Sequence, residues 1–338
     1  MVGSDVLISA LSKQDGKRIE RQLWRLPVNL RKKFPTASLQ DLLDGKHGNY
    51  ATISPATVET YFIAFKGFFS WCFDNELIRT DILSGVKLNR PTSRNDDETK
   101  RRAFHKEELE TLFKSAIFTG RKFQSRNLHI PGSLVVRDGN FWVPIMGLMS
   151  GLRLGEILQL SISDIRLDDG VPYIDVNTFG GKKLKNNQSA RGIPIHPLLK
   201  KIGFLDYVEL RRKSEDNPDA RLVDGIVIPE KGKIIKNYSR SFSAYLKSIG
   251  LKKSNELVFH SLRHNYVSAM RRACKNNPEV MSPLDGRKDV ERSRGTRAGY
   301  GFNLTPKELY EYVEQMDFGI SLSHLYDNKR KRQLDLRE

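Results

Sequence analysis

The sequence predicts a mainly α-helical chain with a small antiparallel β-sheet, an α+β fold arranged in two domains. Apolar residues recur at three- and four-residue spacing within 52–80, which is typical of an amphipathic helix. Two short apolar segments, 172–176 and 191–195, flank a connection rich in Gly, Asn and Lys, as in a β-hairpin. Residues 88–102 combine a proline, small polar residues and dense mixed charge, which indicates an interdomain linker. We therefore expect domains at 1–90 and 101–338, joined by a linker at 91–100.

The segment 52–80 has a clear helix start. Ser54 is a suitable N-cap, and Pro55 fits the first helical position. Its apolar positions define one face, which we interpret as facing the core: Val58, Tyr61, Phe62, Phe65, Phe69 and Cys72.

The second domain alternates helical and extended patterns. AFHKEELETLFKSAIF, which follows the linker, is amphipathic and helical. Residues 141–160 are apolar almost all round, which indicates a buried helical hairpin broken near Gly151. PYIDV at 172–176 and RGIPI at 191–195 are the expected strands, and helical patterns return from residue 197 onward.

Composition excludes several classes of function. The 338 residues contain no apolar run of about 18 or more and no signal-peptide pattern, so we expect a cytoplasmic protein. The two cysteines, Cys72 and Cys274, are far apart, and C-x-x-C, H-E-x-x-H, P-loop and G-x-G-x-x-G patterns do not occur. We therefore expect no bound metal and no cofactor.

Net charge favours a polyanionic partner. The formal charge is +17 with a pI of about 9.8, and it is uneven: +3 over residues 1–100 and +14 over the remainder. Lysine and arginine side chains that face phosphates release counterions, so nucleic acid is a plausible partner. A basic surface that serves only solubility is the alternative, and the basic run near the C-terminus, DNKRKR, fits a solvated end.

Three separated segments carry candidate chemistry. In SGLRLGEILQL, Arg153 and Glu156 are three residues apart, so the carboxylate can orient the guanidinium. In FHSLRHNYVSAM, His260 and Arg263 have the same spacing at an expected helix start, where free N–H groups and an arginine fork favour phosphate. In RAGYGFNLT, glycines flank Tyr300 and allow its hydroxyl to approach a bulky substrate. Each segment alone also fits a purely structural role.

Together and in this order, the segments resemble the tyrosine recombinase or phage integrase family. That family's pattern is G-L-R-x-x-E-I/L-x-x-L, a hairpin lysine, H-x-L-R-H and a tyrosine near the C-terminus, and the resemblance covers about residues 52–326. It implies a helical core-binding domain at 1–90 and a catalytic domain at 101–338. It also implies site-specific recombination of double-stranded DNA from a phage or mobile element. Cleavage and religation would proceed without metal through a 3′-phosphotyrosine intermediate.

The resemblance also implies roles for single residues. Arg153 and Arg263 resemble the arginines that hold the scissile phosphate, and His260 resembles the histidine beside them. Tyr300 resembles the nucleophile. Lys185 resembles the hairpin lysine that protonates the leaving 5′-hydroxyl, with Lys182 and Lys183 as competitors. His264 resembles a residue that orients the active site.

One position departs from the family pattern. The family has a histidine or tryptophan some residues before the tyrosine, but none lies between His264 and Tyr300. Arg287, which follows Gly286, occupies that position. Arginine donates hydrogen bonds to phosphate, but it stays protonated and is a poor general base.

Three alternatives remain open at the level of sequence. One is a catalytically impaired relative that only binds DNA, and another is a type IB topoisomerase-like enzyme. The third is a basic helical interaction protein without enzymatic activity. We expect a monomer in solution and a homo-tetramer on DNA. The C-terminal helix ELYEYVEQM fits either a contact with a neighbouring subunit or a return to its own core.

Overall fold

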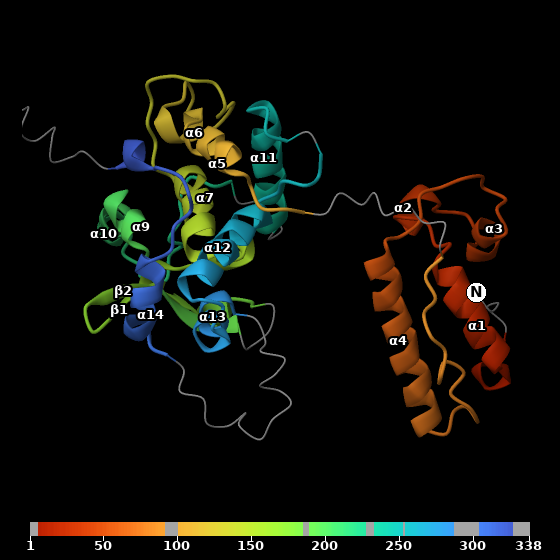
Figure 1. The fold of residues 1–338 in the computed structure, drawn as a ribbon. Coiled ribbons are helices and arrows are strands. Elements are labelled where there is room, and N and C mark those ends of the chain that lie inside the picture. The colour runs from red at the N-terminus through yellow and green to blue at the C-terminus, as the bar shows by residue number, and fades with distance from the viewer. Residues whose placement is uncertain are drawn as a thin grey trace, which may run out of the picture. The chain divides into compact units, whose positions relative to one another are not determined.

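The computed structural model describes residues 6–91, 101–184, 189–227, 233–252, 254–286 and 304–326. The chain divides into two compact units, unit 1 (Met1–Asp97) and unit 2 (Glu98–Glu338) (Figure 1). The mainly helical fold with one small antiparallel sheet confirms the predicted fold class. None of the helices in the described part of the chain combines the length and apolar character that a membrane crossing requires.

Unit 1 is helical, and its two longest helices, α1 and α4, share an apolar core. Its elements are η1 (Ile8–Ala10), α1 (Lys13–Leu23), α2 (Leu30–Lys33), α3 (Leu39–Leu43) and α4 (Pro55–Asp74). Ser12 caps α1 in a capping box with Asp15. Ile19 and Leu23 of α1 pack in the same core as Val58 and Phe62 of α4.

The predicted helix at 52–80 is correct at its start and too long at its end. Ser54 accepts a hydrogen bond from the Thr57 backbone N–H, and Pro55 opens the helix, but the helix ends at Asp74. The predicted apolar face is also only partly buried, because Tyr61 is 46% exposed. The helix carries large apolar residues on several sides, so spacing alone did not identify which of them reach the core.

Unit 2 contains the remaining elements. The helices are α5 (Lys106–Phe113), α6 (Ala116–Thr119), α7 (Gly139–Ser150), α8 (Leu154–Ile157), α9 (Pro197–Lys201), α10 (Phe204–Ser214), α11 (Ile234–Ser248), α12 (His260–Ala273), α13 (Pro278–Asp285) and α14 (Pro306–Glu314). Short 3-10 turns lie at η2 (Ile162–Asp164), η3 (Phe179–Gly181) and η5 (Ser323–Leu325). The strands are β1 (Ile165–Asp168), β2 (Val171–Val176) and β3 (Arg191–Pro194).

The centre of unit 2 is the pair of helices α7 and α12 (Figure 1). Two glycines let them approach closely: a Cβ on Gly147 would lie 2.8 Å from the Phe259 ring, and one on Gly151 would lie 2.1 Å from the Tyr266 ring. Gly151 also ends α7 in the left-handed region, with φ of 61°, as the predicted break requires. The chain therefore turns from α7 into α8 directly against α12.

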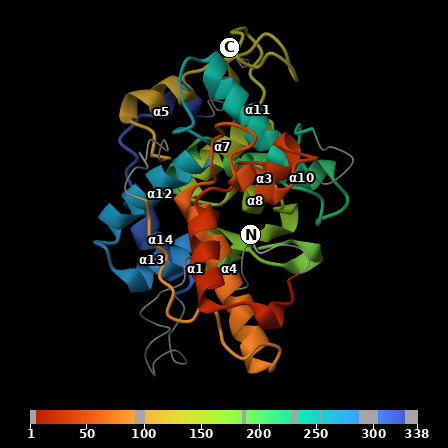
Figure 2. The same cartoon turned by 90° about the vertical axis from the view of Figure 1, so that its right-hand side faces the viewer.

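The sheet is antiparallel in the order β1-β2-β3. Its buried face aligns Ile165, Ile174 and Ile193 across the three strands. The two predicted strands are confirmed, and β1 is an addition. Helices α13 and α14 pack on β3, and both lie below α12 in Figures 1 and 2. Thus α14, with Leu309 and Val313 buried, returns to the core of its own unit.

His196 joins the C-terminal part of unit 2 to the sheet. Its Nδ1 accepts a hydrogen bond from the Leu198 backbone N–H at the start of α9, at 3.1 Å, and its Nε2 donates to the Met316 carbonyl at 3.0 Å. The side chain is buried, and burial lowers its pKa to about 4. The folded protein therefore holds this imidazole neutral under mildly acidic conditions in which an unfolded chain protonates it.

The stability of the protein should fall as the pH falls from about 6.5 to about 4. In this window the unfolded state binds a proton at His196 that the folded state excludes, and the stabilisation is complete above the window. The cost for this one residue is on the order of 3 kcal/mol. Urea unfolding at several pH values should show a flatter pH dependence for His196→Asn. The exposed control His129→Asn should keep the wild-type dependence, and equal dependences in all three proteins would contradict the assignment.

Candidate functional site

Arg153 lies at the turn between α7 and α8, and its side chain is partly exposed. It is the N-cap of α8, two residues after Gly151. Its Nη1 donates to Glu156 Oε1 at 2.6 Å, and its backbone N–H donates to Glu156 Oε2 at 2.9 Å. The Arg153 side chain remains 24% exposed. The predicted pairing of Arg153 with Glu156 is therefore present, and part of the Arg153 side chain is accessible.

Glu156 is a buried carboxylate shared by two arginines. Besides Arg153, it accepts a hydrogen bond at Oε2 from Arg191 Nη2, at 2.9 Å. Burial acts to raise the pKa of Glu156, but the charges and hydrogen bonds of Arg191 and Arg153 hold it below its usual range. The carboxylate is therefore ionised at neutral pH and fixes both guanidinium groups.

Arg263 lies in the first turn of α12 and is buried. Its Nη1 donates to the Gly151 carbonyl, and its Nη2 donates to the Asp285 carbonyl. Burial, followed by the positive charges of Arg191 and Arg153, lowers the pKa of Arg263 to about 10. It therefore remains charged at neutral pH, and its anchor on Gly151 holds it beside the turn that carries Arg153.

His260 opens α12, one turn before Arg263, and is exposed. Partial desolvation, then the charges of His264, Arg263, Arg101 and Arg153, lower its pKa to about 4. The ring contacts that of His264 edge to face, with centroids 5.0 Å apart. His260 is therefore neutral at physiological pH, so it can accept a proton or a hydrogen bond next to the arginines.

The hairpin between β2 and β3 separates the lysine candidates. Lys182 Nζ lies 2.6 Å from Asp164 Oδ2, with both side chains largely buried, and also contacts Asn177. The Gln159 side chain binds the backbone of Lys183, whose own side chain is exposed. Lys182 and Glu156 line one small cavity, so the hairpin base lies near the arginines. Lys182 is thus engaged in a buried ion pair, which disfavours it as a mobile acid.

Three predicted site residues lie outside the described residues: Lys185, Arg287 and Tyr300. The structure does bring Arg153, Glu156, His260 and Arg263 together. It adds Arg191, which the sequence motifs did not single out. The available signal was an arginine at the start of an otherwise apolar strand, RGIPI, because a buried charge requires a partner.

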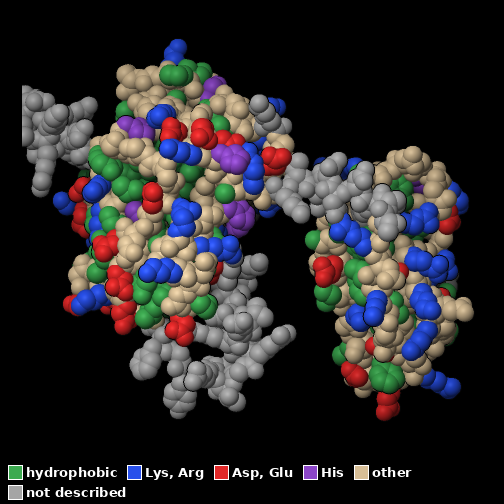
Figure 3. Space-filling view, in the orientation of Figure 1, with side chains coloured by type: hydrophobic (Ala, Val, Ile, Leu, Met, Phe, Trp, Pro, Cys, Tyr) green, Lys and Arg blue, Asp and Glu red, His purple; other side chains and the backbone are tan. Residues whose placement is uncertain are grey.

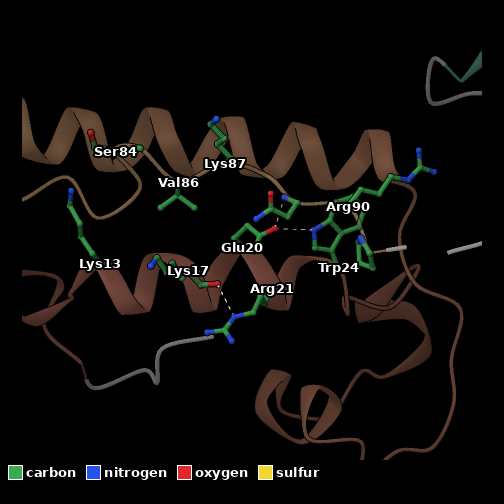
Figure 4. A pocket seen from close by; sticks show the side chains of 12 residues that line it. Lys13, Lys17, Glu20, Arg21, Trp24, Ser84, Val86, Lys87 and Arg90 are labelled. Carbon is green, nitrogen blue, oxygen red and sulfur yellow. Dashed lines mark hydrogen bonds between the residues drawn. The ribbon is translucent and has the colours of Figure 1, made fainter. Parts of the chain in front are cut away.

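Unit 1 carries a separate basic groove of about 1030 Å³ between α1 and the segment 84–91 (Figure 4). Lys13, Lys17 and Arg21 are four residues apart on one face of α1, and Lys87 and Arg90 line the groove from the segment 84–91. Lys and Arg side chains are spread over the face of unit 1 seen in Figure 3.

Glu20 is the carboxylate in this groove, and it is buried. Its Oε1 accepts hydrogen bonds from Trp24 Nε1 at 3.3 Å and from the Asn89 backbone N–H at 2.9 Å (Figure 4). Gly16 lets α1 lie close to the backbone at Ile82, since a Cβ on Gly16 would lie 2.1 Å from the Ile82 carbonyl oxygen. The groove therefore presents mainly positive charge to an incoming ligand.

Replacement of Glu156 by Gln should lower the free energy of unfolding by about 3 kcal/mol, because it leaves the buried Arg191 guanidinium without a counter-charge. Urea unfolding of the full chain measures the effect. Glu209→Gln is the matched control, because Glu209 pairs with Arg212 on the surface, where such pairs contribute less than about 1 kcal/mol. Equal losses in the two variants would show that Glu156 is not a structural charge centre.

Comparison with known proteins relates part of unit 2 to a known family. Residues 140–285, which include Arg153, His260 and Arg263, match the model of the phage integrase family, and Arg287 and Tyr300 follow the matched region. No curated protein sequence matches the chain.

Two solved structures of the Tn1549 transposon integrase have backbones similar to that of this chain. One, with transposon right end DNA, has a TM-score of 0.52 and 14% identity and covers 84% of this chain and 80% of that one. The other, with a circular intermediate DNA, has a TM-score of 0.51 and 14% identity. It covers 98% of this chain and 87% of that one. The integrase of mycobacterium phage Brujita has 16% identity and a TM-score of 0.39 over 92% and 89% of the two chains. Residues 140–285 are therefore similar to the phage integrase family, which the arginine and histidine motifs of this segment also resemble.

Proposed function

We propose that this protein is a site-specific tyrosine recombinase that cuts and rejoins double-stranded DNA during integration or excision of phage or other mobile DNA. The observation that carries the proposal is the arrangement of Arg153 and Arg263. Both are held beside the Gly151 turn, with the neutral imidazole of His260 next to them. Two fixed guanidinium groups are suited to the charge that develops on a phosphate during strand transfer.

In the proposed reaction, the Tyr300 hydroxyl attacks the scissile phosphorus. An O–P bond forms to the tyrosine, and the bond from phosphorus to the 5′-oxygen breaks. The leaving 5′-oxygen takes a proton from the hairpin lysine, for which Lys185 and Lys183 are candidates. His260 accepts a hydrogen bond or the phenolic proton, and Arg287 donates to the phosphate. Attack of another 5′-hydroxyl on the phosphotyrosine reverses these steps and rejoins DNA.

The other tyrosines near the C-terminus are less suited to attack. Tyr310 lies in α14, where its hydroxyl accepts a hydrogen bond from Lys200 Nζ at 3.2 Å and its ring lies under the same ammonium group. Tyr312 and Tyr326 are partly buried against the core of unit 2. These contacts hold the three phenols in place, which supports Tyr300 as the nucleophile.

The DNA partner is supported by charge and by the related structures. The net charge is +17, and the Tn1549 transposon integrase structures contain DNA. We propose that the groove of unit 1 contacts the phosphate backbone, with a monomer in solution and a homo-tetramer on paired DNA sites.

Tyr300→Phe should abolish the covalent protein–DNA adduct on a nicked suicide substrate while DNA affinity stays close to that of the wild type. The phenol oxygen is the only group that this change removes. Gel electrophoresis under denaturing conditions detects the adduct. Tyr310→Phe and Tyr326→Phe should still form it. An adduct from Tyr300→Phe, together with its loss in one of the controls, would contradict the assignment, and supercoil relaxation without a special site would favour a topoisomerase.

DNA affinity should fall with salt concentration, and less steeply when the groove is neutralised. Each phosphate contact adds about 0.9 to the slope of log affinity against log salt. A triple change of Lys13, Lys17 and Lys87 to Gln should therefore reduce the slope by up to about 3. The control replaces Lys32, Lys33 and Lys46, which carry the same charge outside the groove lining. Equal slopes for the two triple variants would exclude the groove as a DNA contact.

A further inference from the structure

Arg191 is the first residue of β3 and is almost completely buried, with a side chain that is 4% exposed. A guanidinium group in such a place is costly unless charges and hydrogen bonds compensate it. Three groups do so, two of them from distant parts of unit 2 and one, the Ser189 carbonyl, from two residues before Arg191. Glu156 Oε2 lies 2.9 Å from its Nη2, the Ser189 carbonyl lies 2.7 Å from its Nη1, and the Leu284 carbonyl lies 3.4 Å from its Nε.

The contact with Glu156 limits how far that carboxylate neutralises Arg153. Glu156 Oε1 binds the Arg153 guanidinium, whereas Oε2 binds the Arg153 backbone N–H and the Arg191 guanidinium. One negative charge is therefore shared by two positive charges. The shared carboxylate holds Arg153 in one orientation and leaves net positive charge on its exposed side. Without Arg191, the second oxygen of the carboxylate would be available to the Arg153 guanidinium as well.

The contact with Leu284 holds the end of α13 beside the same arginines. Arg191 and Arg263 bind the consecutive carbonyls of Leu284 and Asp285, at the helix end where carbonyls lack partners within the helix. Gly286 follows with φ of 61°, and a Cβ there would lie 2.9 Å from Arg191 Nη1. Arg191 therefore packs directly against the last described residue before the segment 287–303, which contains Tyr300.

We propose that Arg191 is a positioning residue of the active site. It orients Arg153 through the shared Glu156 and fixes the end of α13, from which the chain continues to the nucleophile. It acts through these groups and does not itself contact the DNA. This inference rests on the proposed recombinase function and adds to it a residue outside the family motifs that the sequence displays.

The test compares Arg191→Met and Arg191→Lys with a matched control, Arg166→Met. Arg166 lies on β1 of the same sheet, where it pairs with Asp175 and is 45% exposed. Three quantities are measured on the full chain: the urea midpoint, the affinity for a nicked suicide DNA, and the single-turnover rate of adduct formation at saturating DNA. Rates are measured under conditions in which each variant is folded.

Arg191→Met should leave DNA affinity close to the wild-type value and lower the adduct rate by about 100-fold, as expected for misplaced catalytic groups. Arg191→Lys should recover part of the rate and remain about tenfold below wild type, since an ammonium keeps the charge and loses the planar fork. Arg166→Met should react at the wild-type rate. A purely structural role for Arg191 would lower the urea midpoint and leave the rate of the folded protein unchanged.

A folded Arg191→Met variant with the wild-type adduct rate would overturn the inference. If that variant does not fold, Arg191→Lys decides: a rate about tenfold lower supports positioning, and an unchanged rate overturns it. If the wild-type protein forms an adduct and both Arg191 variants form it at the same rate, only the role of Arg191 is rejected. A wild-type protein that forms no adduct would reject the proposed function, and the inference with it.

Discussion

The constraint on which the proposed active site depends is the burial of one carboxylate, Glu156, between two guanidinium groups. A buried carboxylate must be compensated, and Arg153 and Arg191 compensate it from opposite elements, the α7–α8 turn and β3. Because the carboxylate is ionised, each arginine is held in one direction. The burial that makes these charges costly therefore also fixes the orientation of the two arginines. A phosphate would bind at the exposed part of Arg153.

Backbone contacts place the second arginine relative to the first. Arg263 reaches across from α12 to the Gly151 carbonyl, and Gly151 lies against the Tyr266 ring so closely that no side chain fits. The packing of α7 on α12 therefore sets the position of Arg263 relative to the turn that carries Arg153. Partial desolvation, followed by the positive charges around His260, lowers the pKa of its imidazole and keeps the ring neutral. Packing, electrostatics and the proposed proton transfer therefore depend on the same pair of helices.

Sequence reasoning succeeded where the signals are local. The cap Ser54, the break at Gly151 and the pair formed by Arg153 and Glu156 all depend on residues a few positions apart. It missed features that depend on distant segments. Arg191 forms hydrogen bonds with residues 35 and 93 positions away, and β1 is a strand because it pairs with β2. The position of Tyr61 on the exposed side of α4 was likewise decided by tertiary packing and not by helical spacing.

In the proposed recombinase, the basic groove of unit 1 would bind the DNA backbone. The arginine cluster of unit 2 would bind the scissile phosphate. The most direct measurement is a crystal structure of the full chain on a DNA substrate. It should show the scissile phosphate bound by the guanidinium groups of Arg153 and Arg263, with Glu156 still shared between Arg153 and Arg191. A phosphate held elsewhere, or a Glu156 released from Arg153 in the complex, would contradict the role assigned to the buried carboxylate.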